Sequence, residues 1–270
     1  MSIFHKKFDP AIEAENCIRR IKQWFNEESG NAKGAVIGIS GGKDSAVVAG
    51  LFVKAIGKER VFGVLMPNGD YYNNPVKKQD FNDAEDLCLR HLDITYDTFD
   101  ITPIYEIFNN RMNNKFYKND SQLEKCLINV QPRIRMTTLY TIAQNLNYRV
   151  IGTGNSSEAF VGYCTKWGDN ACDFNPIKYF TTDEVVAIGD YLNLPYNIVH
   201  KIPADGLSGK SDEENLGVSY NIINTIITGG NVNEIDPDVL SKVINKYIYN
   251  KHKAIDNMPC YKPDYIENKF

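Results

Sequence analysis

The chain has 270 residues, of which 43% are hydrophobic and 24% charged, and its formal net charge is -4. This length and composition fit one large globular domain, or one domain with an appendage. The mildly acidic balance argues against an extended nucleic-acid surface, and no apolar run is long enough to span a bilayer. We therefore expect neither a nucleic-acid partner nor a membrane partner.

The six cysteines are scattered along the chain and form no C-x-x-C pair. In a chain of this length, such spacing favours reduced thiols in the cytosol over a disulfide framework or a zinc site. A disulfide between Cys164 and Cys172 is the alternative. Residues Met1–Lys7 lack the long apolar core of a signal peptide. We expect a cytoplasmic protein.

The first predicted element is a helix that Asp9 caps and Pro10 opens. Apolar residues between positions 18 and 25 fall on one of its faces, and Gly30 is expected to end it. We expect this helix to be part of the scaffold.

The next apolar run, Ala35–Ile37, predicts a buried strand. It leads into Gly38-Ile39-Ser40-Gly41-Gly42-Lys43-Asp44-Ser45, and residues 46–56 then predict a helix that Gly57 ends. A strand, a glycine turn and a helix start together form an anion site. Adjacent glycines let backbone N–H groups turn toward one point, and the helix dipole adds partial positive charge. Ser40 and Ser45 add hydroxyl donors.

Asp44 has two candidate roles in this turn: capping the helix, or holding a metal ion that bridges phosphate oxygens. Two commoner phosphate loops are excluded by spacing. The Walker loop needs Ser or Thr after its Lys and a Gly where Ile37 stands, and the dinucleotide fingerprint needs G-x-G-x-x-G. A tight strand–helix turn without a ligand is the alternative.

Further strands are predicted at residues 60–66, 94–99 and 148–152. Helices are predicted at 78–87, 102–110, 121–147 with an interruption at Pro132, 182–192, 219–228 and 237–251, with a further short element at Pro195. This alternation predicts an α/β fold with a central parallel sheet and helices on both faces. We expect a single domain over residues 1–270.

A second strand-to-helix turn follows the last predicted strand, at Thr153-Gly154-Asn155-Ser156-Ser157-Glu158. Asn155 or Ser156 is placed to cap the next helix, and a simple capped turn is one interpretation. In a parallel sheet, however, this turn and the glycine turn share one edge. Glu158 and Asp44 are then placed to reach one magnesium ion.

Two polar, glycine-containing segments, 162–177 and 201–217, are predicted to be lid or binding loops. Trp167 and Phe174 are expected to anchor the first of them. Arg133 follows Pro132, and a surface arginine without a ligand is an equally simple interpretation. His252 and Lys253 follow the last helix, where positive charge suits the helix dipole.

The run Ser40–Ser45 resembles the pyrophosphate loop of the N-type ATP pyrophosphatases, which adenylate a carboxylate or carbonyl oxygen and release pyrophosphate. Most of the chain also resembles the ammonia-dependent NAD synthetases. The blocks that carry this resemblance, in the order of that family, are Ser40–Ser45, Gly152–Asn155 with Glu158, Thr165–Asp169, Asp173–Pro176, Asp212–Gly217 and His252-Lys253.

The resemblance implies a Rossmann-like adenine nucleotide alpha hydrolase fold and a homodimer. It implies ATP-dependent amidation of deamido-NAD by ammonia through an acyl-adenylate, giving NAD, AMP and pyrophosphate. By this resemblance, Gly38–Ser45 and Thr153 contact ATP, and Asp44 and Glu158 bind magnesium. The residues that contact deamido-NAD are Arg133, Lys166, Asp173, His252 and Lys253. Catalytic roles are implied for Asp44, Glu158, Lys166 and Asp173.

Three positions depart from the pattern of that family. Thr182 stands where many relatives have an ATP-contacting lysine, Ala204 where many have threonine or serine, and Leu65 where an arginine is common. The positions expected to compensate are Lys178, Ser208 or Lys210.

The glutamine-using relatives carry an amide-hydrolysing domain ahead of the glycine turn. We expect no such domain here, and therefore free ammonia or ammonia from a separate partner. The alternatives are another ATP pyrophosphatase, acting for example on a tRNA base, and a nucleotide-binding regulator without catalysis.

Overall fold

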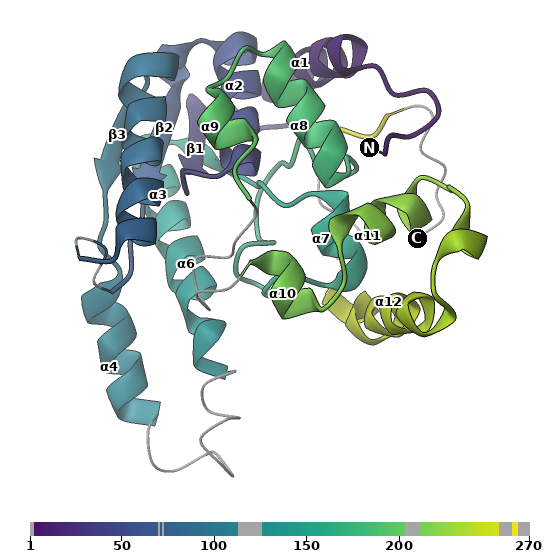
Figure 1. The fold of residues 1–270 in the computed structure, drawn as a ribbon. Helices are drawn as coiled ribbons and strands as arrows, with labels where there is room; N and C mark the ends of the chain where they lie inside the picture. Colours follow the sequence, from purple (N-terminus) through teal and green to yellow (C-terminus); the bar gives the residue numbers. More distant parts are fainter. Residues whose placement is uncertain are drawn as a thin grey trace.

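A computed structural model describes residues 3–69, 71, 73–112, 126–202, 211–253 and 261–263. Within them, four parallel strands form one sheet in the order β3-β2-β1-β4 (Figure 1). The strands are β1 (Gly34–Gly38), β2 (Val61–Leu65), β3 (Thr95–Thr98) and β4 (Tyr148–Ile151). The predicted α/β class and the parallel sheet are confirmed.

One face of the sheet is covered by α1 (Pro10–Glu27), α2 (Lys43–Ile56) and α8 (Thr182–Tyr191), which pack against one another (Figure 1). The α1 helix begins at the predicted cap, where Asp9 Oδ1 accepts the N–H groups of Ala11 and Ile12, each at 3.0 Å. Its buried Trp24 lies against Phe174 in the main core. Burial of this apolar helix face explains why the segment folds here.

The opposite face is covered by α6 (Val130–Leu146). Ala143 of this helix packs in a buried cluster with Val36, Val64 and Val150 from three neighbouring strands. The helices therefore lie on both faces of the sheet, as the sequence predicts.

The remaining elements surround this body. They are α3 (Pro75–Asp86) with a π-helical turn (Leu87–Leu92), α4 (Thr102–Met112), α7 (Ser156–Val161), α9 (Tyr196–Val199), α10 (Asp212–Leu216), α11 (Tyr220–Ile227), α12 (Pro237–Asn250) and the 3-10 turns Lys58–Arg60, Val232–Glu234 and Lys251–Lys253. In Figure 1, α7, α10, α11 and α12 form a group beside the sheet. Val161, Ile223 and Val243 form the core of this group.

Some boundaries differ from the prediction. Pro132 lies inside the first turn of α6 and does not interrupt it, because a proline in a first turn removes no intrahelical hydrogen bond. The break lies at Asn129, and residues 121–125 of the predicted helix lie outside the described part of the chain. The α3 helix begins at Pro75, since Asn74 caps it.

The predicted loops also differ in part. The segment 201–217 contains the helix α10, which Ser211 and Glu214 start with a reciprocal capping box. Phe174 is fully buried, but Trp167 is 58% exposed and so does not anchor the first loop. None of the helices within the described residues combines the length and hydrophobicity needed to cross a bilayer.

Candidate active site

The glycine turn lies at the carboxyl end of β1, where Gly38 ends the strand and Lys43 begins α2. Gly41 has a φ of +80°, and a Cβ atom at this position would lie 2.1 Å from the backbone oxygen of Asp80. Only glycine fits there. Gly42 is the N-cap residue and has no side-chain cap, so Asp44, in the first turn of α2, does not cap the helix.

The serine hydroxyls hold the turn in shape. Ser40 N–H donates to Ser45 Oγ at 3.3 Å, and Gly42 N–H donates to Ser40 Oγ at 3.3 Å. A serine Oγ moves when χ1 changes rotamer, so these N–H donors can change partner without a backbone shift. Ile39 offers no such donor, because its N–H donates to Val64 O at 3.0 Å and its side chain is buried in the core.

Asn155 joins the glycine turn to the turn that follows β4. Its Nδ2 donates to Asp44 Oδ1 at 3.1 Å, and its Oδ1 accepts the N–H of Glu158 at 3.1 Å. Glu158 Oε2 accepts the N–H of Asn155 in return, which completes a capping box for α7. Asp44 and Glu158 thus lie at the same edge of the sheet, as the parallel topology predicts. Thr153 lies half-buried in this second turn.

This edge is rich in buried charge. Lys43 is only 6% exposed, and its Nζ forms an ion pair with Asp44 Oδ2 at 2.8 Å. Burial, and then the negative charge of Asp44, raise the pKa of Glu158 well above its ordinary value. Burial alone would lower the pKa of Lys43, but the carboxylates of Asp44 and Glu158 outweigh it and raise that pKa. The lysine is therefore cationic among carboxylates.

Asp212, the first residue of α10, adds a third carboxylate whose charge acts on both Lys43 and Glu158. Its Oδ2 accepts a hydrogen bond from the buried hydroxyl of Tyr220 at 3.1 Å. The sequence placed Asp212 in a resembling block but assigned it no role. Its neighbours Glu213 and Glu214 are also acidic and all three begin α10, so no local signal distinguishes Asp212.

Asp44 and Glu158 offer carboxylate oxygens from two adjacent turns. Among the described residues, no group of three or more His, Cys, Asp or Glu side chains is arranged to enclose a metal ion. Mg²⁺ does not need such a cage, because it commonly binds one or two carboxylates and takes its other ligands from water and substrate phosphates. This donor set fits Mg²⁺.

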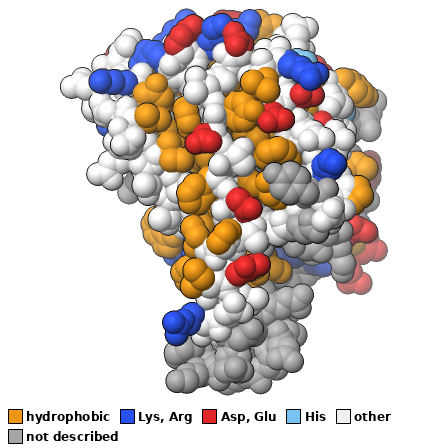
Figure 2. Space-filling view, turned by 90° about the vertical axis from the view of Figure 1, so that its left-hand side faces the viewer, with side chains coloured by type: hydrophobic (Ala, Val, Ile, Leu, Met, Phe, Trp, Pro, Cys, Tyr) orange, Lys and Arg blue, Asp and Glu red, His pale blue; other side chains and the backbone are white. Residues whose placement is uncertain are grey.

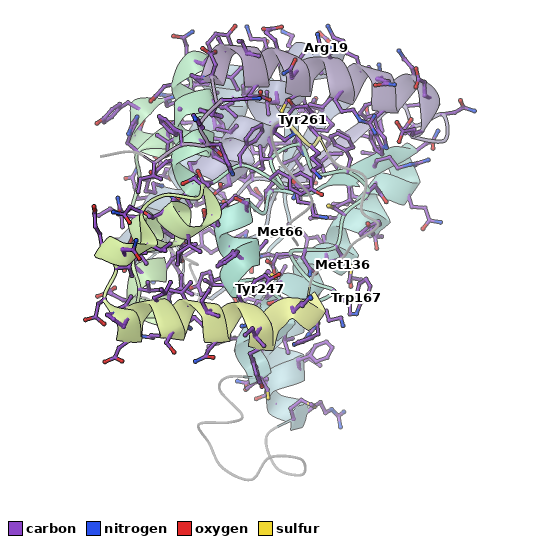
Figure 3. The ribbon with its side chains drawn as sticks, turned by 90° about the vertical axis from the view of Figure 1, so that its right-hand side faces the viewer. Arg19, Met66, Met136, Trp167, Tyr247 and Tyr261 are labelled. Carbon is purple, nitrogen blue, oxygen red and sulfur yellow. The ribbon has the colours of Figure 1, made fainter. Side chains whose placement is uncertain are left out.

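Arg133 and Lys253 contact the backbone of the loop 162–177, which carries Lys166. Arg133 donates from Nε and Nη2 to the backbone oxygen of Lys166 at 3.3 and 3.2 Å. Lys253 Nζ donates to the backbone oxygens of Gly162 at 2.7 Å and Cys164 at 3.0 Å. Figure 3 shows the neighbouring Trp167 near the end of α12. The exposed His252 belongs to the same 3-10 turn as Lys253.

Asp173 is fixed beside β4. Its Oδ2 accepts the N–H of Val150 at 2.8 Å, and its Oδ1 accepts the hydroxyl of Tyr140 at 3.3 Å. Burial, with the charge of Asp173, raises the pKa of Tyr140, which therefore stays a neutral donor. The carboxylate is thus oriented by the strand and by α6.

The family of the chain follows from comparison with known proteins. The family model described as NAD synthase matches residues 15–258. The NH(3)-dependent NAD(+) synthetase of Carboxydothermus hydrogenoformans is 38% identical over 222 residues, which are 81% of this chain and 87% of that protein.

The chain belongs to the NAD synthase family.

Two solved structures superimpose along nearly the whole chain. The NMN synthetase of Francisella tularensis has a TM-score of 0.80 at 32% identity and covers 96% of this chain and 100% of its own. The NH3-dependent NAD synthetase of Campylobacter jejuni has a TM-score of 0.73 at 30% identity, with the same coverage of both chains.

The departures from the family pattern have structural counterparts. Thr182 is 4% exposed; its N–H donates to Ser157 Oγ at 3.0 Å and its Oγ1 accepts from Asn224 Nδ2 at 2.9 Å. It is part of a buried hydrogen-bond network that excludes a long cation. Leu65 is 1% exposed in the core. Ala204, Ser208 and Lys210 lie outside the described residues.

Arg135 is a site candidate that the sequence did not distinguish from a surface arginine. Its Nε donates to the backbone oxygen of Met66 at 3.1 Å, at the carboxyl end of β2 and next to Leu65. Burial lowers its pKa to about 10, and Asp169 opposes this shift. A half-buried guanidinium thus lies beside Leu65, where the family resemblance leads us to expect an arginine.

Proposed function

We propose that this protein amidates deamido-NAD with ammonia at the expense of ATP, giving NAD, AMP and pyrophosphate. It is then a carbon–nitrogen ligase at the last step of NAD biosynthesis. The observation that carries this proposal is the junction of the glycine turn with Asp44 and Glu158, in a chain of the NAD synthase family. A nucleotide phosphate site and a carboxylate pair at one sheet edge are what adenylation needs.

The chemistry has two steps. The nicotinate carboxylate attacks the α-phosphorus of ATP, forming an acyl-adenylate and expelling pyrophosphate. Ammonia then attacks the acyl carbon and displaces AMP. In this proposal, the turn Gly38–Ser45 binds the phosphates through its free backbone N–H groups, which excludes that of Ile39, and Thr153 contacts the same nucleotide. The Nζ atom of Lys43 lies 2.8 Å from Asp44 Oδ2 and adds positive charge at this edge of the sheet.

Asp44 and Glu158 are proposed to hold Mg²⁺. When bound, Mg²⁺ neutralises negative charge on the phosphate oxygens of ATP. Asn155 orients both residues, since it donates to the Asp44 carboxylate and caps the helix that carries Glu158. The protein thus holds the carboxylates of Asp44 and Glu158 close together in spite of their repulsion.

Arg133, Lys166, Asp173, His252 and Lys253 are proposed to bind deamido-NAD, with Lys166 and Asp173 closest to the reaction. The contacts of Arg133 and Lys253 support this role, because both side chains hold the backbone of the loop that carries Lys166. Lys178, Ser208 or Lys210 is proposed to contact ATP in place of the lysine absent at Thr182.

A second candidate substrate is nicotinic acid mononucleotide, which would give NMN. The observation that favours it is the similarity to the NMN synthetase structure, whose TM-score of 0.80 exceeds the 0.73 of the Campylobacter jejuni NAD synthetase. The two acids carry the same carboxylate and differ in the adenylate half. Both reactions would use the same glycine turn and carboxylate pair.

We also propose that residues 1–270 form one domain and that the protein acts as a cytoplasmic homodimer. Cys17, Cys88, Cys126 and Cys164 are thiols, as in proteins of reducing compartments. Figure 2 shows hydrophobic side chains over the face where β3, α3 and α4 lie, and Ile107 and Phe108 of α4 are exposed. An apolar face of this kind supports a protein interface.

The test measures release of pyrophosphate from ATP in the presence of Mg²⁺, ammonium and either deamido-NAD or nicotinic acid mononucleotide. Each component is then omitted in turn. Deamido-NAD and nicotinic acid mononucleotide are compared at equal concentration, and the dinucleotide or mononucleotide amide is identified by mass spectrometry. A higher kcat/KM for deamido-NAD supports the proposal, and a preference for the mononucleotide supports the second candidate. Release that depends on neither acid would reject both and point to another substrate, such as RNA. No release under any of these conditions would leave a regulatory role.

A further inference from the structure

Lys201 follows the short helix α9 and reaches the glycine turn with its ammonium group. Its Nζ lies 2.9 Å from the backbone oxygen of Gly41 and 2.9 Å from Asp80 Oδ1, and it also contacts Asp83 Oδ2. An ammonium group has three N–H donors. Each of them therefore has an acceptor, one from the glycine turn and two from α3.

The acceptors on α3 are themselves fixed. Asp83 is 5% exposed, and its Oδ1 accepts from Gln79 Nε2 at 2.8 Å and from Asn197 Nδ2 at 3.1 Å. Because a buried carboxylate needs a counter-charge, Asp83 and Lys201 hold each other in place. The ammonium is thus a rigid group beside the turn.

The contact with Gly41 determines how one peptide group of the turn points. In a planar trans peptide, the C=O of one residue and the N–H of the next point in opposite directions. The oxygen of Gly41 points to Lys201, so the N–H of Gly42 points to the inner side of the turn, where it donates to Ser40 Oγ at 3.3 Å. That inner side is where a phosphate would accept it.

Glycine allows the opposite orientation at little cost, because it has no Cβ atom to restrict the backbone. A flipped peptide would direct the carbonyl oxygen of Gly41 toward the phosphate, where two negative groups repel. The turn itself contains no cation that prevents this, since Lys43 is paired with Asp44. Lys201 supplies the selecting contact from outside the turn.

We propose that Lys201 is a positioning residue for the ATP site. Its ammonium holds the Gly41 carbonyl away from the phosphates and so presents the Gly42 N–H to them. Lys201 does not itself need to touch ATP, because its donors are already occupied. This role rests on the proposed function only in requiring that the glycine turn bind ATP.

The test compares Lys201→Met, which keeps most of the side-chain stem, with Lys201→Arg, which keeps the charge. The matched control is Lys242→Met, because Lys242 Nζ donates to the carbonyl of Gly217 at 2.8 Å, the same kind of contact outside the turn. Binding of ATP with Mg²⁺ to the full chain is measured by calorimetry, together with the KM values of ATP and of the acid substrate.

We expect Lys201→Met to weaken ATP binding about tenfold to a hundredfold, the range for losing a hydrogen bond to a charged group. The KM of the acid should stay within about twofold, Lys201→Arg should recover most of the ATP affinity, and Lys242→Met should match the wild type. ATP binding by Lys201→Met at wild-type strength would overturn the proposal. The proposal would also be overturned if Lys201→Met weakened the use of ATP and of the acid equally, or if Lys242→Met weakened ATP binding as much as Lys201→Met.

Lys201→Gln covers the case in which the methionine variant does not fold. Its amide is uncharged, and ATP binding at least about threefold weaker than in the wild type is expected. Unchanged binding would again reject the role. The titration contains neither acid nor ammonia, so it tests Lys201 even if the protein proves to amidate another substrate.

Discussion

Asn155 Nδ2 donates a hydrogen bond to Asp44 Oδ1 at 3.1 Å, across 111 positions of the chain. The same side chain caps α7 through the N–H of Glu158. One amide therefore sets the separation between two carboxylates that repel each other. The two functions of this side chain can be separated by substitution.

Asn155→Ser should keep the cap but lose the bond to Asp44, because a serine oxygen caps a helix well and is too short to reach further. Asn155→Ala should lose both. We expect Asn155→Ala to lower the free energy of unfolding by about 1 kcal/mol and Asn155→Ser to lower it by less. Both variants should need more Mg²⁺ for half-maximal activity. Urea melts and magnesium titrations measure the two effects, and a normal magnesium requirement in both variants would show that Asn155 is only a cap.

Glu158→Gln should abolish the magnesium response without unfolding the protein. The amide keeps an oxygen that accepts the N–H of Asn155, and it removes a buried charge that Asp44 repels. We expect kcat to fall more than about 100-fold, since a bound metal supplies several kcal/mol of charge stabilisation. In thermal melts, Mg²⁺ with ATP should raise the Tm of the wild type more than that of the variant. An equal rise in both would exclude Glu158 as a ligand.

Lys253→Ala should raise the KM of deamido-NAD about tenfold or more and leave the KM of ATP nearly unchanged. Lys253 holds the backbone at Gly162 and Cys164, at the start of the loop that carries Lys166, and losing charged hydrogen bonds releases that loop. Lys251→Ala is the control, because Lys251 is an exposed lysine of the same 3-10 turn. Equal KM values of deamido-NAD for Lys253→Ala and Lys251→Ala would contradict the assignment of Lys253 to the deamido-NAD site.

Restoring the lysine of many relatives, Thr182→Lys, should destabilise the protein rather than improve ATP binding. Thr182 is 4% exposed and accepts from the buried Asn224, so the variant buries a charge and leaves an amide donor without its acceptor. We expect a loss of about 2–3 kcal/mol in the free energy of unfolding. Thr182→Ser, which keeps the hydroxyl, should lose much less. A lower KM for ATP in the lysine variant would show instead that the position faces the nucleotide.

The cysteines should differ sharply in reactivity. Burial raises the pKa of Cys88 from 9.0 to about 12, whereas Cys126 is exposed. Alkylation at pH 8 followed by mass spectrometry should modify Cys126 and spare Cys88, because the thiolate is the reactive form. As pH rises from 9 to 12, the Cys88 thiol ionises in the unfolded protein before it ionises in the folded protein. Cys88 therefore lowers the free energy of unfolding in that range. Rapid modification of Cys88 in folded protein would contradict its burial.

The regular elements of this fold could be predicted from local sequence. Asp9-Pro10 marks the start of α1 and Gly57 marks the end of α2, because caps and breakers act over a few residues. The shared edge of the two turns also followed from the sequence, since parallel strands align their carboxyl ends. The interruption predicted at Pro132 was wrong, because a proline breaks a helix in its interior but not in its first turn.

What could not be predicted were contacts between distant segments. Nothing near Lys201 in the sequence indicates that it reaches Gly41, 160 positions away. Thr182 likewise gives no local sign of its partner Asn224. Such pairings depend on how α3, α8, α9 and α11 pack, and local propensity carries no information about that packing.

β1 is an interior strand whose two neighbours come from very different parts of the chain. Its partner β2 follows after a single helix, but β4, on the other side, begins only at Tyr148. During synthesis on a ribosome, the nascent chain therefore carries β1 with one unpaired edge until residues 148–151 emerge. Glu158 emerges later still, and Lys253 later again. Until both have emerged, the site lacks one proposed metal ligand and one proposed substrate contact, so ligand binding at a complete site cannot stabilise the nascent chain.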